Sequence, residues 1–370
     1  MNVVDLLLKL LSCKSLTPDD DGSLQFIEEY LDGYEALYVN KEGIKNLFLY
    51  KTFGNKKFGE GTHLCFAGHV DVVPPGDHWD TNPFVPVIKE GNIYARGAQD
   101  MKSGVAAFVQ ACKEVENFNG TLSLLLTSDE EGEGKYGTSV MLEYLKEKVM
   151  LPDYCIVAEP TCEMVFGDAI KIGRRGSING YLTIQGKQGH AAYPEKAVNP
   201  LHQIAPVLDK IAGVDLDEGD DDFSPSKMVI TDIRGGMEVT NVTPGSLKIM
   251  FNVRNSTKTT QEDIRMHIEK YFDGLDYSLT LTQGSYPFVT TRDSKVVKIL
   301  TQSIEEITGI KTKLSTAGGT SDARFMGAYG IDVVEFGVIN DTIHAPNEHT
   351  SVQEVEKLYK VFTRCIQNFS

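Results

Sequence analysis

The sequence predicts an α/β fold in which a second domain interrupts the first. Between residues 1 and 175, apolar segments of strand length alternate with helical segments, an order typical of a layered α/β domain. Between residues 176 and 285 the order becomes β-α-β-β-α-β, which is the ferredoxin-like arrangement. The α/β pattern returns after residue 286. We therefore predict a discontinuous domain, formed by residues 1–175 and 286–370, with an inserted domain at 176–285.

The discontinuous domain begins with an amphipathic helix, because Val3, Val4, Leu7, Leu8 and Leu11 recur at helical spacing. Apolar runs then predict buried strands, with helical patterns between them. After the insertion, a helix, a strand and a closing helix complete the domain. The predicted strands are 46–50, 63–68, 121–127, 153–158 and 331–337, and the predicted helices are 103–116, 136–149, 294–308 and 352–369.

The inserted domain is predicted from alternating strands and two helical segments. Its strands are expected at 178–186, 227–236, 246–255 and 277–284, and its helices at 199–213 and 260–272. An acid-rich stretch at 215–226 lies within it. We interpret this stretch as a solvated loop, because it lacks the glycine-centred pattern of an EF-hand calcium loop.

Composition narrows the classes of partner. The 370 residues are 41% hydrophobic and carry a net charge of -16, which argues against nucleic acid and anionic membrane as partners. An anionic substrate would therefore need local arginines. No apolar run approaches the ~20 residues of a membrane span. The first residues lack the basic segment and the cleavage site of a signal peptide. The six cysteines form no CxxC pair, and we expect a reducing, cytoplasmic location.

Histidine and carboxylate side chains follow the predicted strands at the points where the strands end. Each one alone is more often a surface residue or a helix cap, and an acid run is more often a solvated loop. In an α/β sheet, however, ligands bind beyond the carboxyl ends of the strands. Several histidine and carboxylate side chains at the same edge of the sheet therefore favour a cation site. The residues are His69, Asp71, Asp100, Asp129, Glu130, Glu131, Glu133, Glu159 and His344.

This set of side chains indicates the kind of metal. Histidine with carboxylate, without cysteine, suits zinc or a similar divalent ion. Two histidines and several carboxylates are too many for one tetrahedral ion, and they fit two ions ~3.5–4 Å apart. His69 and Asp71 are two residues apart and point the same way along an extended segment. We therefore expect the Asp71 carboxylate to accept a hydrogen bond from the far ring nitrogen of His69.

Several motifs resemble the M20 family of di-zinc peptidases. They are "AGHVDVVPPGDHW", "RGAQDMKSG", "TSDEEGEGKYGT", "AEPT", "RRGSINGYLTIQGKQGHAAYPEKAVNP", "TNVTPG" and "GGTSDARF", spread over essentially the whole chain in the family's order. The resemblance implies a di-zinc aminopeptidase-like catalytic domain and an inserted dimerisation domain that pairs with its copy in a homodimer. It also implies a cis peptide bond between Asp100 and Met101.

The resemblance assigns roles to the strand-end residues. Asp100 would bridge two zinc ions, with His69 and Glu159 completing one site and Glu131 and His344 the other; cobalt or manganese could replace zinc. Glu130 would be the general base, and its acidic neighbours are expected to raise its pKa. Asp71 would support His69. His190 would reach into the active site of the partner subunit and stabilise the oxyanion.

The motifs "RRGS" and "GGTSDARF" narrow the resemblance to members that release succinate from N-succinyl-L,L-2,6-diaminopimelate. That substrate has three carboxylates, which guanidinium groups bind in a bidentate way. Arg174, Arg175 and Arg254 are the main candidates, with Arg324 beside them, although any single arginine could equally form a surface salt bridge. The weaker candidates are Ser177, Tyr193, Asn241, Gly319 and Thr320, whose alternative role is turn formation.

Two alternatives stay open at this stage. Other M20 enzymes, such as acetylornithine deacetylases, aminoacylases and carboxypeptidases, share the same ligand set. A metal-free scaffold or binding module could also keep the fold, although such a protein would be expected to have lost ligands. Departures from the family pattern are few: Gln99 stands where relatives often have a small residue, and Thr240 where a second Asn is common.

Overall fold

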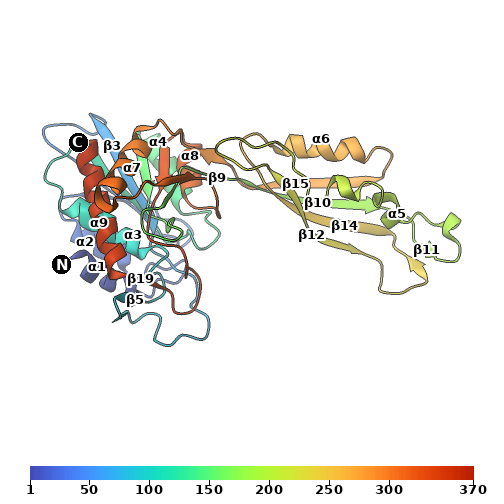
Figure 1. The fold of residues 1–370 in the computed structure, drawn as a ribbon, viewed down its shortest axis with the longest axis horizontal. Coiled ribbons are helices and arrows are strands. Elements are labelled where there is room, and N and C mark those ends of the chain that lie inside the picture. The colour runs from blue at the N-terminus through green and yellow to red at the C-terminus, as the bar shows by residue number, and fades with distance from the viewer. The chain divides into compact units, whose positions relative to one another are not determined.

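The structure is a computed structural model that describes residues 1–370. The chain forms two compact units, each described separately below (Figure 1). Unit 1 contains Met1–Gly173, Val289–Ser315 and Ser321–Ser370, and unit 2 contains Arg174–Phe288 and Thr316–Thr320. The chain passes between the units within the short strands β9 (Gly173–Arg174) and β16 (Phe288–Val289), and again on either side of Thr316–Thr320. No helix combines the length and apolar character that crossing a bilayer requires.

Unit 1 is built on an eight-stranded sheet in the order β1-β2-β6-β3-β7-β18-β8-β17. Its central strands β6, β3, β7 and β18 are parallel, so their carboxyl ends meet at one edge. All eight residues of β6 are buried, which shows that both faces of the sheet are covered there. The strands are β1 (Glu35–Tyr38), β2 (Asn46–Thr52), β3 (Thr62–His69), β6 (Gly120–Thr127), β7 (Tyr154–Val157), β8 (Ala169–Lys171), β17 (Lys313–Ser315) and β18 (Asp332–Glu335).

Helices α1, α3, α7 and α9 pack against one another beside this sheet, and Figure 1 shows α1, α3 and α9 side by side. Phe66 on β3 contacts Phe108 of α3 and Phe362 of α9, which joins the sheet to both helices. Helices α4 and α8 form a second pair. The helices are α1 (Val3–Leu11), α2 (Ser23–Tyr30), α3 (Lys102–Lys113), α4 (Thr138–Glu147), α7 (Lys295–Thr308), α8 (Ala323–Ala328) and α9 (Val352–Phe369).

A small antiparallel sheet in unit 1 brings together segments that are far apart in the sequence. It contains β4 (Val87–Lys89), β5 (Asn92–Tyr94) and β19 (His349–Ser351), in the order β19-β5-β4. His349 pairs with Tyr94, and their rings stack with centroids 4.9 Å apart. This register places the segment that follows β5 beside the segment that precedes β19.

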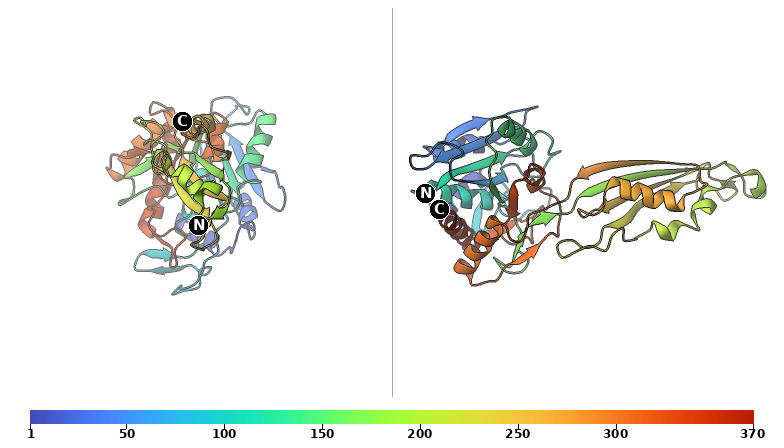
Figure 2. Two further views of the ribbon diagram at one scale, coloured as in Figure 1. Left: turned by 90° about the vertical axis from the view of Figure 1, so that its right-hand side faces the viewer. Right: turned by 90° about the horizontal axis from the view of Figure 1, so that it is seen from above.

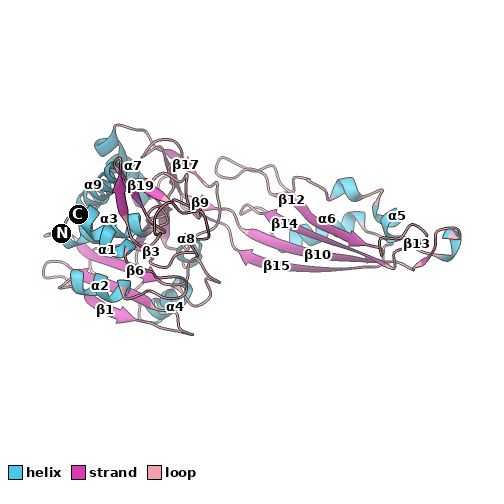
Figure 3. Ribbon diagram, turned by 90° about the horizontal axis from the view of Figure 1, so that it is seen from below, coloured by secondary structure: helices cyan, strands magenta, loops and turns pink.

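Unit 2 is a four-stranded antiparallel sheet with two helices on one face. Its strand order β12-β14-β10-β15 and its element order β10-α5-β12-β14-α6-β15 are those of the ferredoxin-like fold, so the predicted fold class is confirmed. Both helices lie in front of the sheet in the right-hand view of Figure 2 and behind it in Figure 3. The elements are β10 (Ser177–Gln185), α5 (Pro200–Ile204), β12 (Lys227–Gly235), β14 (Ser246–Arg254), α6 (Gln261–Tyr271) and β15 (Tyr277–Ser285).

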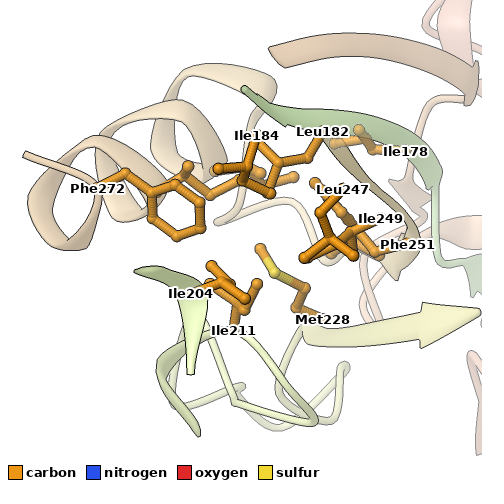
Figure 4. Close-up of a cluster of buried hydrophobic side chains, with 13 residues drawn as sticks. Ile178, Leu182, Ile184, Ile204, Ile211, Met228, Leu247, Ile249, Phe251 and Phe272 are labelled. Carbon is orange, nitrogen blue, oxygen red and sulfur yellow. The ribbon is translucent and has the colours of Figure 1, made fainter. Parts of the chain in front are cut away.

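Alternate residues of these strands form the core of unit 2 (Figure 4). Ile178, Leu182 and Ile184 of β10 point to the same face because side chains alternate along a strand. They pack with residues from β12, β14 and both helices. The buried partners are Ile204, Ile211, Met228, Leu247, Ile249, Phe251, Val253, Ile264, Ile268 and Phe272. Unit 2 therefore buries its own hydrophobic core.

One predicted helix is shorter than expected. The pattern at 199–213 predicts a single helix, but α5 ends at Ile204 and a short 3-10 helix follows at Leu208–Lys210. Pro206 explains the difference, because proline has no N–H to donate and disfavours helical geometry in the residue before it.

Candidate metal centre

The predicted metal ligands of unit 1 converge from separate strand ends. His69 is the last residue of β3, Glu130 and Glu131 follow β6, and Glu159 follows β7. The remaining two come from segments beside the small sheet, Asp100 after β5 and His344 before β19. Parallel strands bring their carboxyl ends to one edge, which explains why residues so far apart in the sequence meet.

Asp100 lies between the two histidines and presents one carboxylate oxygen to each. Its Oδ1 lies 3.2 Å from Nε2 of His69, and its Oδ2 lies 3.4 Å from Nε2 of His344. Nε2 of His344 also lies 3.0 Å from Oε1 of Glu131, and Nε2 of His69 lies 3.9 Å from Oε1 of Glu159. Asp100 thus has the geometry of a bridging ligand, with one histidine and one glutamate on each side.

The donor set fits divalent ions. The ligand atoms of His69, Asp100 and Glu131 lie within 4.8 Å of one another, and those of His69, Glu130 and Glu159 do the same. Imidazole and carboxylate without thiolate is a zinc-type set. The buried Oδ1 of Asp322, which has no hydrogen-bond partner, adds negative charge near Glu130. Buried carboxylates in this number need compensating positive charge, which bound cations would supply.

The contact between His69 and Asp71 differs from the predicted one. Nδ1 of His69 lies 2.9 Å from the backbone carbonyl of Asp71, whereas the Asp71 carboxylate is 3.6 Å away, beyond hydrogen-bond distance. The expected acceptor atom was therefore wrong. The chain bends after β3 ends at His69, so the two side chains do not follow the alternation of a regular strand.

The Asp71 carboxylate instead holds the loop after β6. It accepts the backbone N–H of Glu130 at 3.4 Å and that of Glu131 at 3.2 Å, and it accepts the hydroxyl of Thr17 at 2.7 Å. Asp71 thus fixes the main chain of the predicted base and of a predicted ligand. Thr17 was not predicted, because a lone threonine 54 residues away gives no sequence signal.

The four acids of residues 129–133 have different surroundings. Asp129 is buried and accepts the backbone N–H of Tyr136 at 3.1 Å, so it closes the loop. Glu130 and Glu131 join the ligand cluster, and Glu133 is exposed. Gly132 lies close to these side chains, since a Cβ there would lie 2.6 Å from Oδ1 of Asp129 and would force a side chain to shift. Half of the acid run therefore faces the centre.

Burial raises the pKa of Glu130 to about 8, and the carboxylates of Asp322, Asp100 and Glu131 add to the rise. The expected direction is confirmed, but burial outweighs the acidic neighbours that the sequence suggested. A carboxyl with a pKa near neutrality can both accept and return a proton, which suits a general base. Burial likewise raises the pKa of Glu159, with Asp100 and Glu130 contributing.

Both histidines are held in their charged form when no cation is present. Burial opposes protonation of His69, but Asp100, Asp71 and Glu159 keep its pKa well above the ordinary value. Hydrogen bonds to Asp100 and Glu131 raise the pKa of His344 to about 10. These histidines in turn lower the pKa of Asp100 against its burial. The same carboxylates would attract bound cations.

A buried ion pair holds the segment that carries Asp100. Oε2 of Glu348 accepts from Arg96 at 2.6 Å and from the backbone N–H of Gly97 at 3.0 Å. Its Oε1 accepts the backbone N–H groups of Gln99 at 2.8 Å and Asp100 at 3.0 Å. Sequence reasoning missed Glu348 and Arg96, because the partners are 252 residues apart and each is a single charge in a loop.

Two glycines allow close packing around Glu159. A Cβ on Gly104 would lie 2.2 Å from the carbonyl oxygen of Ala158, and one on Gly337 would lie 2.4 Å from that of Glu159. Helix α3 and the segment after β18 therefore approach the end of β7 directly. The peptide bond between Asp100 and Met101 is cis, as the motif resemblance implied.

The predicted substrate-binding residues lie in unit 2, with the exception of Arg324, which lies in α8 of unit 1. Arg174 is buried, and its Nη1 donates to the carbonyls of Gly319 at 3.0 Å and Ala317 at 3.4 Å. Arg175 is half-buried and Arg254 is exposed at the end of β14. Ser177 accepts a hydrogen bond from Asn252, and Thr320 is exposed.

His190, Tyr193 and Asn241 come together elsewhere in unit 2. His190 lies on β11 (Gly189–His190), which pairs with β13 (Val242–Thr243). Its exposed ring lies 5.8 Å from that of Tyr193, and Asn241 accepts the backbone N–H of Ala191. Nδ1 of His190 accepts the backbone N–H of Ala192 at 3.0 Å, so Nε2 carries the proton of the neutral ring and can donate it.

Comparison with known proteins places this arrangement in a family. The model of peptidase family M20/M25/M40 matches residues 65–368, which include every predicted metal ligand. This chain belongs to peptidase family M20/M25/M40. The M20 match covers most of both units.

Relatives and solved structures agree with this M20 membership. The succinyl-diaminopimelate desuccinylase of Sulfurovum sp. (strain NBC37-1) is 69% identical over 370 residues, covering 100% of both chains. Four other curated relatives, 62–67% identical, carry the same name. The aminopeptidase PepT of Bacillus cereus superposes with a TM-score of 0.80 at 21% identity, covering 99% of this chain and 98% of that one.

A further M20 structure bears on the metal centre. The YXEP protein of Bacillus subtilis, described as a dinuclear metal-binding peptidase, superposes with a TM-score of 0.69 at 13% identity, covering 98% of this chain and 96% of that one. At this identity the likeness shows a shared fold. The chain thus has the fold of a metal-dependent family and the ligand groups to match.

Proposed function

We propose that this chain hydrolyses the amide of N-succinyl-L,L-2,6-diaminopimelate, releasing succinate and L,L-diaminopimelate, a precursor of lysine and of the cell wall. One observation carries the assignment: 69% identity to a succinyl-diaminopimelate desuccinylase extends over the full length of both chains. The converging histidines and carboxylates of unit 1 supply chemistry that fits amide hydrolysis. A cytoplasmic location follows from a biosynthetic role.

Two divalent ions, zinc or its substitutes cobalt and manganese, are the proposed cofactor. His69 and Glu159 would hold one ion, Glu131 and His344 the other, and Asp100 would bridge them, in keeping with its two oxygens facing the two histidines. When bound, such ions polarise a carbonyl and lower the pKa of water to about 7.

Glu130 is the proposed proton carrier. It takes a proton from the attacking water as the new C–O bond forms, and it gives that proton to the leaving amine as the C–N bond breaks. Glu130 alone therefore accepts and returns this proton. Its raised pKa supports both steps, because the carboxyl is neither too weak as a base nor too weak as an acid near neutral pH. Asp71 keeps Glu130 in place through its backbone N–H.

Unit 2 is proposed to bind the anionic substrate and to pair with a second copy in a homodimer. Arg175 is half-buried and Arg254 is exposed, so their guanidinium groups can reach substrate carboxylates. Arg174 supports the 317–319 segment beside Gly319 and Thr320. In the dimer, His190 of one copy would donate from Nε2 to the oxyanion formed in the other, with Tyr193, Asn241 and Ser177 contributing polar contacts.

A hydrolysis assay tests the proposal. Purified protein is given N-succinyl-L,L-2,6-diaminopimelate, and succinate release is measured with and without a chelator, followed by zinc. We expect turnover that the chelator abolishes and zinc restores. N-acetyl-L-ornithine and N-acetyl-L-methionine serve as parallel substrates. Fast turnover of an acetyl compound without succinate release would identify another M20 deacylase, and fewer than one ion per chain with no chelator effect would identify a scaffold.

A further inference from the structure

The side chain of Gln99 joins the segment carrying Asp100 to the segment carrying His344. Its Oε1 accepts the backbone N–H of Thr342 at 2.7 Å, that of Asp341 at 3.2 Å and the Thr342 hydroxyl at 3.2 Å. Its Nε2 donates to Oδ1 of Asp341 at 2.6 Å and to the carbonyl of His349 at 3.1 Å. The carbonyl oxygen and the amino group of the Gln99 amide are therefore both fully hydrogen-bonded.

These contacts act on one side of the candidate metal centre. The segment 341–349 begins three residues before His344 and ends where β19 starts, and Gln99 bonds to both of its ends. His344 itself adopts a left-handed backbone conformation with φ of 59°, which a non-glycine residue keeps only when its surroundings hold it. The hydrogen bonds of the Gln99 side chain go to Asp341, Thr342 and His349, and none goes to the segments of His69 or Glu159.

Gln99 is also buried, with only 2% of its surface exposed. A buried amide that loses its partners leaves unpaired polar groups, so this side chain fixes the loop geometry rather than following it. Glu348, near the end of the same segment, holds the main chain of Asp100, and Nη2 of Arg96 donates to the carbonyl of His344 at 3.4 Å. Removal of the Gln99 amide would therefore loosen the beginning of the His344 segment, at Asp341 and Thr342, while Asp100 stays in place.

We infer that Gln99 is a positioning residue that sets the affinity of the ion bound by Glu131 and His344, while leaving the His69 and Glu159 ion largely unchanged. The inference rests on the two-ion centre of the proposed function and adds to it an asymmetry between the ions. Residues that orient metal ligands through hydrogen bonds typically change metal affinity ~10–100-fold when removed. We expect a change of that size for one ion only.

Titration of the metal-free full chain with Zn²⁺, against a competing chelating dye, tests the inference. Wild type should bind two ions. Gln99→Ala should bind one of the two ions at least ~10-fold less tightly. Gln110→Ala is the matched control. Gln110 lies in α3, is also buried, accepts a hydrogen bond from Tyr30 and donates one to Glu114. Its replacement should leave both Zn²⁺ dissociation constants unchanged.

Two single-site backgrounds show which ion is affected. In a His69→Ala background, Gln99→Ala should weaken the remaining ion by the same ~10-fold or more. In a His344→Ala background, Gln99→Ala should change the remaining ion's dissociation constant less than about threefold, because distant groups act additively. Equal weakening in both backgrounds, or unchanged binding in both, would overturn the inference.

An isosteric variant guards against loss of folding. Gln99→Glu keeps the shape of the side chain but places a carboxylate against Oδ1 of Asp341. It should therefore also weaken binding of the ion held by Glu131 and His344. The double variant Gln99→Glu/Asp341→Asn restores a donor–acceptor pair and should regain part of the affinity. Absence of any regain would contradict the hydrogen-bond role. The Zn²⁺ titrations need no substrate, so a failed succinyl assay would reject the proposed function and leave this result standing.

Discussion

The backbone carbonyl of Asp71 accepts the hydrogen bond of Nδ1 of His69, and this leaves the Asp71 carboxylate free for the loop that carries Glu130. The ring of His69 is therefore oriented by main chain, with Nε2 facing Asp100. The sequence assigned the orientation of His69 to the Asp71 carboxylate, but the backbone carbonyl of Asp71 performs it, and the carboxylate holds the loop of Glu130 instead.

Asp71→Asn separates these two functions. The carbonyl that orients His69 remains, so zinc stoichiometry should stay at two and the dissociation constants should change little. The amide has a single acceptor oxygen, so one backbone N–H of Glu130 or Glu131 loses its partner, and kcat should fall about 10–100-fold. Parallel zinc titration and steady-state kinetics measure both.

The control for this change is Asp168→Asn. Asp168 also accepts backbone N–H groups, those of Glu163, Met164 and Val165, but it belongs to a different loop of unit 1. It should lower stability and leave kcat unchanged. A loss of zinc in Asp71→Asn that matches the loss of kcat would contradict the separation.

Glu130→Gln should remove proton transfer while keeping the metal. The amide has nearly the same shape but cannot take a proton from water, so kcat should fall at least about 10²–10⁴-fold, with KM changed little. Metal analysis should still find two ions per chain. Near-wild-type turnover in this variant would exclude Glu130 as the proton carrier.

Glu348→Gln should destabilise unit 1 strongly. It leaves the buried guanidinium of Arg96 without its charged partner and removes an acceptor for the main chain of 97–100, so the free energy of unfolding should fall by about 3–5 kcal/mol. Trp79, the only tryptophan, lies 5.3 Å from Arg96 and reports this unfolding by fluorescence in urea.

Glu306→Gln provides the comparison. Glu306 pairs with Arg364 at 3.2 Å on the surface, where such pairs contribute about 0–1 kcal/mol. Equal effects of the two substitutions would show that the Glu348 pair gives no more than a surface ion pair.

The sequence predicted three of the metal ligands because they follow strands of the parallel sheet, where chain order and spatial position are linked by the fold. His69, Glu131 and Glu159 needed only the strands to be recognised. His344 was predicted because it follows the strand at 331–337 after a short loop. The raised pKa of Glu130 was predicted in direction, although its main cause, burial, is invisible without the packed structure.

The supporting contacts could not be predicted in the same way. Glu348 and Arg96 meet only because β19 pairs with β5, a register that the short strands at 92–94 and 349–351 do not reveal. Gln99 could be noted as unusual, but its five hydrogen bonds depend on a loop more than 240 residues later. The end of helix α5 at Ile204, in contrast, could have been predicted from Pro206.

His190→Ala should lower kcat by about 10²–10³-fold without releasing metal, because it removes an oxyanion donor and no ligand. If subunits share sites, mixing this variant with Glu130→Ala should restore turnover. A heterodimer would then contain one site with an intact Glu130 and a His190 from the partner copy. Size-exclusion chromatography establishes the dimer, and differently tagged chains confirm mixing. A mixture no more active than its two components would argue against shared sites.

The metal-free protein should lose stability as pH rises. Glu130 has a pKa raised from 4.5 to about 8, and His344 one raised from 6.5 to about 10. In both cases the folded state binds its proton more tightly than the unfolded chain. The resulting stabilisation is complete below the unfolded pKa and disappears as pH rises through the folded value. The pKa of Asp100 is lowered, so Asp100 is ionised in both the folded and the unfolded chain above pH 5. Its contribution to stability therefore does not change above pH 5.

Urea unfolding in the presence of a chelator, followed by Trp79 fluorescence, should therefore show a fall of at least about 2 kcal/mol between pH 5 and 8. Most of this fall comes from the buried Glu130, because solvent screens the exposed His344. Zinc should reverse the trend, because cations replace the protons and bind more tightly as the ligands lose them. Glu130→Gln removes one titrating group and should flatten the chelator curve. Stability that stays level or rises over this interval without metal would show that the carboxylate cluster does not carry the excess charge on which the two-ion centre depends.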